Sequence, residues 1–197
     1  MYAKVEDNTV VKVNSSVASF NKAALNWSKA QLEANGIYEV VYDNTNLKNN
    51  RFYINGAERF TFANDTVTAS YTLAAGKALD DFNEVDNEGS ALLDDNGNQI
   101  VTLGLKSNEK NQIKAQAATL LQSTDWYVIR NAESSTAIPA NVSTYRTAVR
   151  TKSNEIETSI DGAASVEALE ALFTYINTGT EANRVYARPL GEWPILA

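Results

Sequence analysis

The chain has 197 residues, of which 44% are hydrophobic and 21% are charged, a composition typical of globular proteins and not of disordered chains. Its net charge of −7 and the scatter of its basic residues argue against a nucleic-acid partner, because no basic patch is present to collect phosphates. The absence of cysteine and histidine excludes disulfides, thiolate chemistry, the commonest general base and the commonest transition-metal ligand.

Apolar runs in the sequence are all too short for a membrane span, and the first residues lack the basic-then-apolar pattern of a secretory signal. These features predict a protein made in the cytoplasm and not inserted into a membrane. The length suits one large domain or two small ones.

The first part of the chain predicts a β-rich domain with one helix. Alternating side chains on either side of residues 6–9 predict an opening β-hairpin. Helical spacing from Asn21 to a stop at Gly36 predicts a helix in which Trp27 is a buried core residue.

Four further segments have the pattern of strands in an antiparallel sheet. Asn55-Gly56 predicts a tight hairpin between the second and third of them. Their aromatic side chains either pack on the core or form a face that meets a partner. The segments are residues 37–42, 51–54, 59–62 and 66–73.

Residues 76–104 are acidic and rich in turns. The oxygen-bearing side chains of Asp94–Asn98 suggest a calcium loop, but Gln99 and Leu105 stand where an EF-hand needs Gly and a bidentate Glu. A hairpin turn at Asn96-Gly97 explains the same residues better. We therefore predict no metal ion and no cofactor, and a hinge that closes a β-rich domain of residues 1–104.

Residues 105–179 predict a helical domain. Apolar residues recur at helical spacing from Ser107, again from Pro139 or Ala140 to Gly162, and from a Ser165 cap to Asn177. Thr124 either ends the first helix or caps a short one over residues 126–132. Amphipathic helices joined by short breaks predict a hairpin or small bundle, so the fold class is α+β.

Residues 180–197 have no helical period and predict an extended tail that docks on this chain or on another one. No phosphate-binding glycine loop is present, and the carboxylate pairs Asp80-Asp81 and Asp94-Asp95 lie beside turn residues, where solvated charge is the default. The sequence thus predicts no catalytic residues and no enzyme.

Three short motifs carry a resemblance to a known family. Leu120-Leu121 precedes Thr124-Asp125-Trp126, Tyr145-Arg146 is followed by Val149-Arg150, and Trp193-Pro194 lies close to the C-terminus. This pattern, with an opening strand at Met1–Val5, resembles the tail-fibre assembly chaperones of bacteriophages. The chain departs from that family by placing a whole helix, residues 165–177, between the Tyr-Arg helix and Trp-Pro.

The resemblance implies a non-enzymatic phage tail protein that binds tail-fibre or other tail components, as an assembly chaperone or a retained fibre-associated factor. The alternative is a structural virion protein that links or decorates the tail. Either would work in the host cytoplasm during assembly or on the virion tail, alone or as a homo-oligomer. The candidate partner-contact or corner-forming residues are Trp126, Tyr127, Arg130, Tyr145, Arg146, Arg150 and Trp193.

Two expectations about these residues can be compared with a structure. Trp126 is expected to be buried in the corner between helices, so that its removal would cost several kcal/mol, as for other large buried aromatics. Arg146 and Arg150 lie four residues apart on one helical face. They are expected to be surface charges paired with nearby carboxylates, or a fork that binds a partner's carboxylate.

Overall fold

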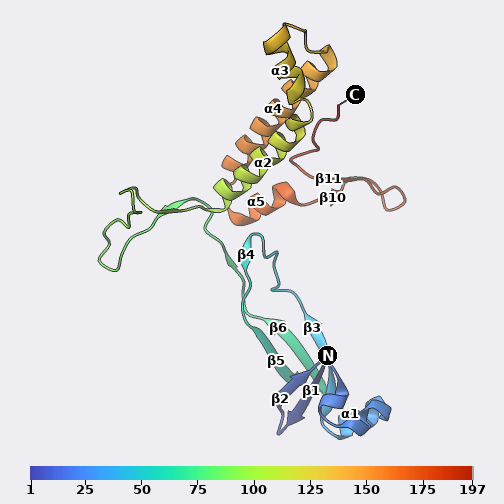
Figure 1. Ribbon diagram of the computed structural model, residues 1–197. Helices are drawn as coiled ribbons and strands as arrows, with labels where there is room; N and C mark the ends of the chain where they lie inside the picture. The colour runs from blue at the N-terminus through green and yellow to red at the C-terminus, as the bar shows by residue number, and fades with distance from the viewer. Residues whose placement is uncertain (197) are drawn as a thin grey trace. The chain divides into compact units, whose positions relative to one another are not determined.

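The computed structural model describes residues 1–196, which have a mixed α+β fold (Figure 1). The chain divides into two compact units, a β unit of residues 1–76 and a helical unit from residue 77 onward. The sequence predicted the boundary between the β-rich and helical domains at residue 104 instead. The difference arises because residues 78–81 bond to the start of the first long helix and so belong with it.

A five-stranded sheet with the order β2-β1-β3-β6-β5 forms the β unit. Its strands pair antiparallel except for β3 and β6, which run parallel, so the expectation of a purely antiparallel sheet is wrong at that pair. The edge strands β2 and β5 approach each other, which gives the sheet its curl. The strands are β1 (Tyr2–Glu6), β2 (Thr9–Asn14), β3 (Ile37–Asp43), β5 (Glu58–Ala63) and β6 (Thr66–Tyr71).

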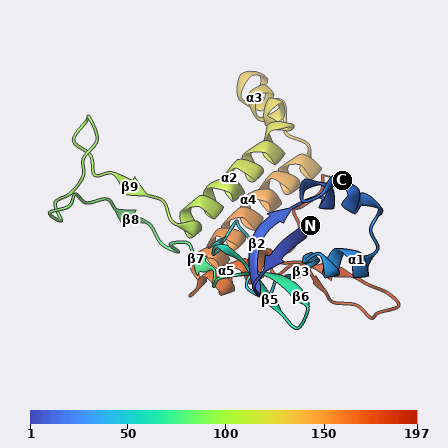
Figure 2. The same cartoon turned by 90° about the horizontal axis from the view of Figure 1, so that it is seen from below.

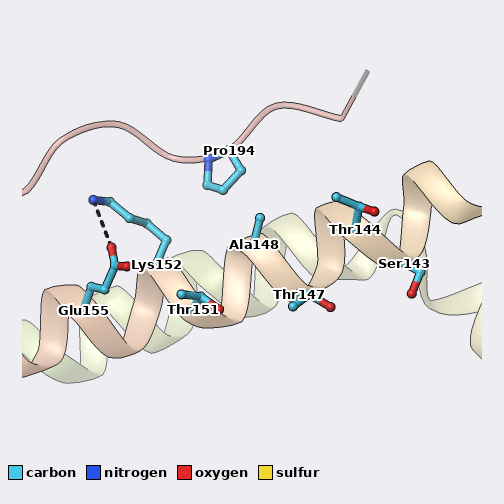
Figure 3. Close-up of a pocket in the computed structure, with 8 residues that line it drawn as sticks. All are labelled: Ser143, Thr144, Thr147, Ala148, Thr151, Lys152, Glu155 and Pro194. Carbon is cyan, nitrogen blue, oxygen red and sulfur yellow. Dashed lines mark ion pairs between the residues drawn. The ribbon is translucent and has the colours of Figure 1, made fainter.

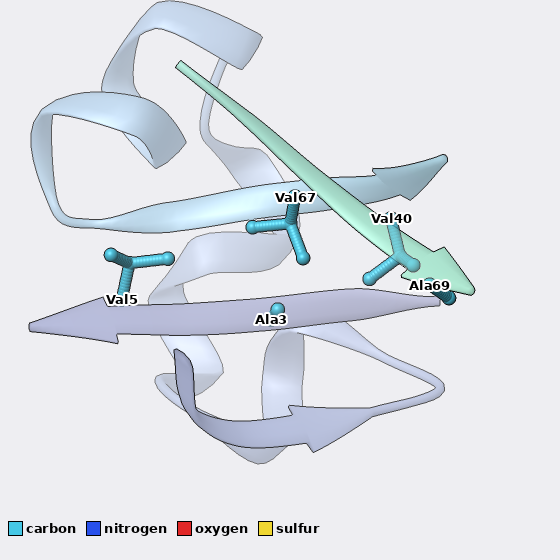
Figure 4. Close-up of a cluster of buried hydrophobic side chains, with 5 residues drawn as sticks. All are labelled: Ala3, Val5, Val40, Val67 and Ala69. Carbon is cyan, nitrogen blue, oxygen red and sulfur yellow. The ribbon is translucent and has the colours of Figure 1, made fainter. Parts of the chain in front are cut away.

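The larger buried cluster of the β unit lies on one face of this sheet, and a second cluster that includes Ile37 lies on the opposite face. Alternate residues of a strand point to the same face, and the buried side chains follow that period. Phe60 and Phe62 pack against the core, and the ring of Phe62 lies 4.7 Å from that of Tyr38. These sheet aromatics therefore serve the core. The buried cluster contains Ala3, Val5, Val40, Val67 and Ala69 (Figure 4).

The single helix expected over residues 21–35 is broken into shorter pieces. Two 3-10 turns, η1 (Val17–Ser19) and η2 (Lys22–Asn26), precede α1 (Lys29–Ala34). Ser28 caps the start of α1 in a capping box with Gln31. The Ser28 hydroxyl accepts the Gln31 amide, and the Gln31 side chain accepts the Ser28 amide. Trp27 is half-buried against the cluster of Val17, Ala24 and Ile37, so it contributes to the core without being enclosed.

The hairpin predicted at Asn55-Gly56 does not form. β4 (Tyr53–Ile54) pairs with β7 (Ala75–Gly76), and the tight turn lies at Asn64-Asp65, where φ is 49° and 54°. The Asn55 side chain bonds both backbone groups of Lys48 instead of supporting a turn. Gly56 is needed because a side chain there would overlap Thr72.

The helical unit begins with an acidic arm, residues 78–103, that contains the short strands β8 (Phe82–Asn83) and β9 (Val101–Thr102). The expected turn at Asn96-Gly97 is present, with Gly97 at a φ of 82° and a bridge between Leu93 and Gln99. The arm loops away from the helices in both views (Figures 1 and 2). It leads directly into α2 (Leu105–Gln122), whose first two amides, of Leu105 and Lys106, donate to the Ala78 and Leu79 carbonyls. The Asp81 carboxylate accepts the Gly104 amide and the Ser107 hydroxyl beside them.

Acid should open the arm turn at Asp94. Hydrogen bonds to its carboxylate, first from the Asn98 backbone and then from the Asn98 side chain, lower the pKa of Asp94. Because the folded pKa lies below the unfolded value of about 3.9, the stabilisation is present above that value and is lost as pH falls through the folded pKa. Amide chemical shifts of Asn96 and Asn98 should therefore titrate below about pH 4.

The Asn64-Asp65 turn of the β unit supplies the control for this titration. Its described side-chain hydrogen bond runs from the Thr66 hydroxyl to the Asn64 carbonyl and uses no carboxylate. The Thr66 amide should not follow the Asp94 transition. An Asn98 amide that titrates at the ordinary pKa of a free carboxyl would contradict the expected depression.

α2 and α4 (Ala140–Asp161) form an antiparallel pair. Lys110 bonds Asp161 at 2.7 Å and Lys114 lies 3.4 Å from Glu157, so increasing numbers on one helix meet decreasing numbers on the other. Pro139 precedes α4 and Gly162 caps its end, as predicted. No helix within residues 1–196 is both long and apolar enough to cross a bilayer.

Two shorter helices complete the helical unit. α3 (Asp125–Ser134) follows α2 almost at once, and α5 (Val166–Phe173) follows α4. Ser165 caps α5 through its hydroxyl, as predicted, but the helix ends before the expected Asn177 because Ile176–Asn177 forms β10 with β11 (Tyr186–Ala187). Leu169 of α5 is fully buried.

Candidate partner-binding site at the corner of α2, α3 and α4

Thr124 forms the corner where α2 gives way to α3. Its backbone, at φ −115° and ψ 4°, leaves the helical region, so one helix ends at Gln122 and the next begins at Asp125. The Thr124 side chain caps neither helix. It donates to the Leu121 carbonyl at 2.8 Å, which turns its hydroxyl inward, and the residue is 1% exposed.

Arg146 of α4 closes this corner from the other side. Its Nη1 donates to the Leu121 carbonyl at 2.9 Å, the Thr124 hydroxyl at 2.7 Å and the Asp125 carboxylate at 2.8 Å. The residue is 7% exposed. The expected pairing with a nearby carboxylate is present, to Asp125, but Arg146 is not a surface charge. Its described bonds join α4 to the α2–α3 junction and do not form a fork toward a partner.

Tyr145 extends the same internal network. It is buried, and its hydroxyl donates to the Leu120 carbonyl at 3.3 Å. Tyr145, Ala117 and Val149 form a buried cluster, against which Leu120, Leu121 and Trp193 pack. Tyr145 and Arg146 therefore both stabilise the junction between α2 and α3.

Trp193 shows where the C-terminal tail docks. Its ring packs on the cluster around Tyr145, and its Nε1 donates to Gln116 of α2 at 3.1 Å. The tail therefore docks on its own chain, which was one of the two predicted outcomes. Pro194 lies over α4 beside an open groove of about 560 Å³ whose wall includes Ala148, Thr151 and Lys152 (Figure 3).

Trp126 is exposed, contrary to the prediction of a buried corner residue. Its exposed fraction is 52%, and no residue of α3 is buried. α2 and α4 already bury each other's apolar stripes, and Thr124 with Arg146 fills the joint between them. No buried position at the corner is left for the indole ring.

An aromatic and cationic stack stands on this exposed helix. The rings of Trp126 and Tyr127 lie 4.4 Å apart, and the Arg130 guanidinium lies 4.6 Å from the first ring and 5.3 Å from the second. Arg130 also reaches the Ala137 carbonyl at 3.4 Å. Such cation–π contacts favour this arrangement of the three side chains by about 0.5–1 kcal/mol at an exposed site.

Arg150 does not join either group. It is exposed, and its one hydrogen bond within residues 1–196 goes to the Arg146 carbonyl at 3.5 Å. The seven candidate residues therefore separate into three sets. Tyr145, Arg146 and Trp193 build the corner, and Arg150 lies on the solvent side of α4. The exposed Trp126 and the half-buried Tyr127 and Arg130 form a surface that we name the α3 stack.

No protein-family model, curated protein or solved structure matches this chain. The function is therefore argued from the residues of the corner and from the α3 stack. The sequence missed two apolar members of the exposed surface, Val128 at 40% and Ile129 at 56% exposure. The sequence signal was the run Trp-Tyr-Val-Ile at residues 126–129. It places large apolar or aromatic side chains all around the helix, more than one packed face can bury.

Proposed function

We propose that this chain is a non-enzymatic bacteriophage tail protein that binds tail-fibre or other tail components, as an assembly chaperone or a retained fibre-associated factor. The carrying observation is the α3 stack, which stands partly exposed beside a corner that Tyr145 and Arg146 close through internal hydrogen bonds. The motif that resembles the phage family thus supplies the joint and, in Trp126, one residue of the exposed surface.

The composition of the α3 stack suits protein binding. Tryptophan, tyrosine and arginine are the residues most enriched among those that dominate interface energies. Because Arg130 contacts both rings, part of the side-chain freedom is already restricted before association. The adjacent Ile129 adds apolar area next to the rings.

Trp126→Ala should weaken partner binding strongly while leaving the fold intact. We expect a change below about 1 kcal/mol in the free energy of unfolding, since the ring is half-exposed. Capture of the fibre protein should fall by about 30-fold or more, as at other interface hot spots. The measurement is co-expression with the tail-fibre protein of the same phage, followed by quantitative co-purification.

Tyr186→Ala is the matched control, because Tyr186 is an aromatic residue of the same unit with 58% exposure. It should leave capture unchanged. Equal losses for the two variants would show that the α3 stack is not the contact surface. Failure of the unaltered chain to capture the fibre protein would remove the fibre-binding function itself.

A structural virion protein that links or decorates the tail is the second candidate. It is favoured by the exposed apolar side chains of the acidic arm, which a permanent neighbour would cover. In this version the chain would be a fixed component, alone or as a homo-oligomer. Quantitative mass spectrometry of purified particles separates a transient chaperone, which should be absent from them, from a structural protein, which should be present at a defined copy number. A retained fibre-associated factor would also be present, and loss of fibre capture in Trp126→Ala distinguishes it.

The two units also suggest a division of roles, which we include in the proposal. The β-rich N-terminal unit and the helical C-terminal unit would act as separate domains, with the partner held by the helical one. The α3 stack, the corner and the docked tail all lie in the helical unit.

A further inference from the structure

The acidic arm is built on an eight-residue repeat. Glu84, Leu92 and Ile100 begin three successive copies, and the second position is apolar in each, as Val85, Leu93 and Val101. The first two copies continue with an aspartate at position three and a glycine at position six. These are Asp86 with Gly89 and Asp94 with Gly97.

Both complete copies fold into the same turn. The Asp86 carboxylate accepts the amides of Glu88 and Ser90 at 2.8 and 2.9 Å, and Asp94 accepts those of Asn96 and Asn98 at 2.9 and 2.8 Å. The two glycines have positive φ values of 83° and 82°. The arm is therefore an ordered repeat and not an irregular loop.

The three copies bond to one another in a closed ring. Glu84 donates its amide to the Ile100 carbonyl, Ile100 to Leu92, and Leu92 to Glu84, at 2.9, 2.8 and 3.0 Å. The Gln99 side-chain amide lies within 3.1 Å of all three carbonyls. These backbone groups are used internally, so this part of the arm does not invite pairing with another strand. A partner must be bound through side chains.

The side chains that the arm offers are apolar and acidic. No residue from Lys77 to Leu103 is buried. Isolated exposed apolar residues are normal, but seven large apolar side chains exposed on one short arm point to an interaction surface. The exposed large apolar side chains of the arm are Phe82, Val85, Leu92, Leu93, Ile100, Val101 and Leu103.

The arm also carries the net charge of the whole chain. Residues 78–103 contain seven carboxylates and no basic residue, whereas the chain contains 24 acidic and 17 basic residues, which leaves 17 of each elsewhere. A second copy of this chain would meet the arm either with its own acidic arm or with the rest of its surface, whose charges sum to zero. Like charges brought together oppose association, so self-association is disfavoured.

We propose that the acidic arm is a docking surface for a protein segment in which basic residues are interspersed with apolar ones. The apolar side chains supply the buried area, and the carboxylates around them select a positively charged partner. Glu88 and Asp95 are the selecting charges. Neither side chain takes part in a hydrogen bond or ion pair within residues 1–196. This surface is distinct from the α3 stack, and the proposal does not depend on a tail partner.

Two soluble synthetic peptides test this chemistry on the full chain. In one, lysine alternates with valine, and in the other lysine alternates with serine, so their charges match. At about 0.15 M salt, where long-range attraction is screened, the lysine–valine peptide should bind at least about tenfold more tightly. Amide chemical shifts should move in residues 82–103 and not in α3.

Matched variants separate the two contributions. Glu88→Gln with Asp95→Asn should weaken lysine–valine binding about 3- to 10-fold, because two unpaired charges are removed. Val85→Ser with Leu93→Ser should reduce it to the affinity of the lysine–serine peptide. Glu39→Gln with Glu181→Gln removes the same charge outside the arm and should have no effect.

Several results would overturn the proposal. Equal affinity for the two peptides would mean charge attraction alone, and shifts outside the arm would place the binding elsewhere. A second copy of the chain would be the occupant if amide chemical shifts of the arm changed with protein concentration in the absence of peptide. Those changes should then vanish in Val85→Ser with Leu93→Ser.

The arm proposal is independent of the proposed function. Failure of the fibre protein to co-purify would leave the arm proposal standing, because the peptide test does not use that protein.

Discussion

Arg146→Ala is expected to lower the free energy of unfolding of the helical unit by about 2–4 kcal/mol. The substitution leaves the Leu121 carbonyl and the enclosed Thr124 hydroxyl without the charged donor that now joins them. Breaking a buried ionic network by removing one partner is costly because the remaining polar groups stay desolvated. The half-exposed Asp125 contributes less, since water can replace its bond.

Arg150→Ala is the matched control on the same helix. Arg150 is exposed, and its bond to the Arg146 carbonyl is long at 3.5 Å, so the expected loss is below about 1 kcal/mol. Urea unfolding followed by far-ultraviolet circular dichroism reports mainly on the helical unit, which contains α2 to α5. Similar losses for the two arginines would show that Arg146 does not hold the corner.

Ile156→Ala should destabilise the same unit by about 2–5 kcal/mol, the usual range for deleting most of an enclosed aliphatic side chain. Ile156 lies in the C-terminal half of α4 with 2% exposure. Its removal loses the transfer free energy of the deleted carbons and leaves a cavity, because the ion pairs that Glu157 and Asp161 make with α2 hold the two helices together next to the site.

Ile129→Ala in α3 is the same chemical change at 56% exposure. It should shift the unfolding midpoint by less than the equivalent of about 0.5 kcal/mol. A comparable loss at Ile129 would mean that α3 packs on the α2–α4 pair more closely than its exposure indicates. Both variants retain the Thr124–Arg146 contact, so they test packing and not the corner bonds.

Local chemistry made several elements predictable from the sequence. Ser165 begins α5 because its hydroxyl satisfies a free amide of the first turn, and Pro139 precedes α4 because proline is accommodated at a helix start. The Asn96-Gly97 turn requires a positive φ that glycine adopts without strain. Each of these choices depends on neighbours within a few residues.

Predictions failed where a distant partner decided the outcome. Asn55-Gly56 looked like a hairpin, but Asn55 bonds Lys48 and β4 pairs with a strand some twenty residues onward. β3 and β6 run parallel because the chain forms β5 at the sheet edge before it returns as β6. The antiparallel β5–β6 hairpin thus sets the direction of β6 beside β3. Local propensity does not report such long-range competition.

The candidate site shows the same division at single residues. The sequence by itself determined that Thr124 interrupts the helix, that Tyr145 and Arg146 lie on one amphipathic helix, and that no thiolate or imidazole chemistry is present. Only the tertiary structure decided that Arg146 is enclosed and that Trp126 is exposed. The reason is physical: burial depends on which faces α2 and α4 turn toward each other, and that packing involves residues more than twenty positions apart.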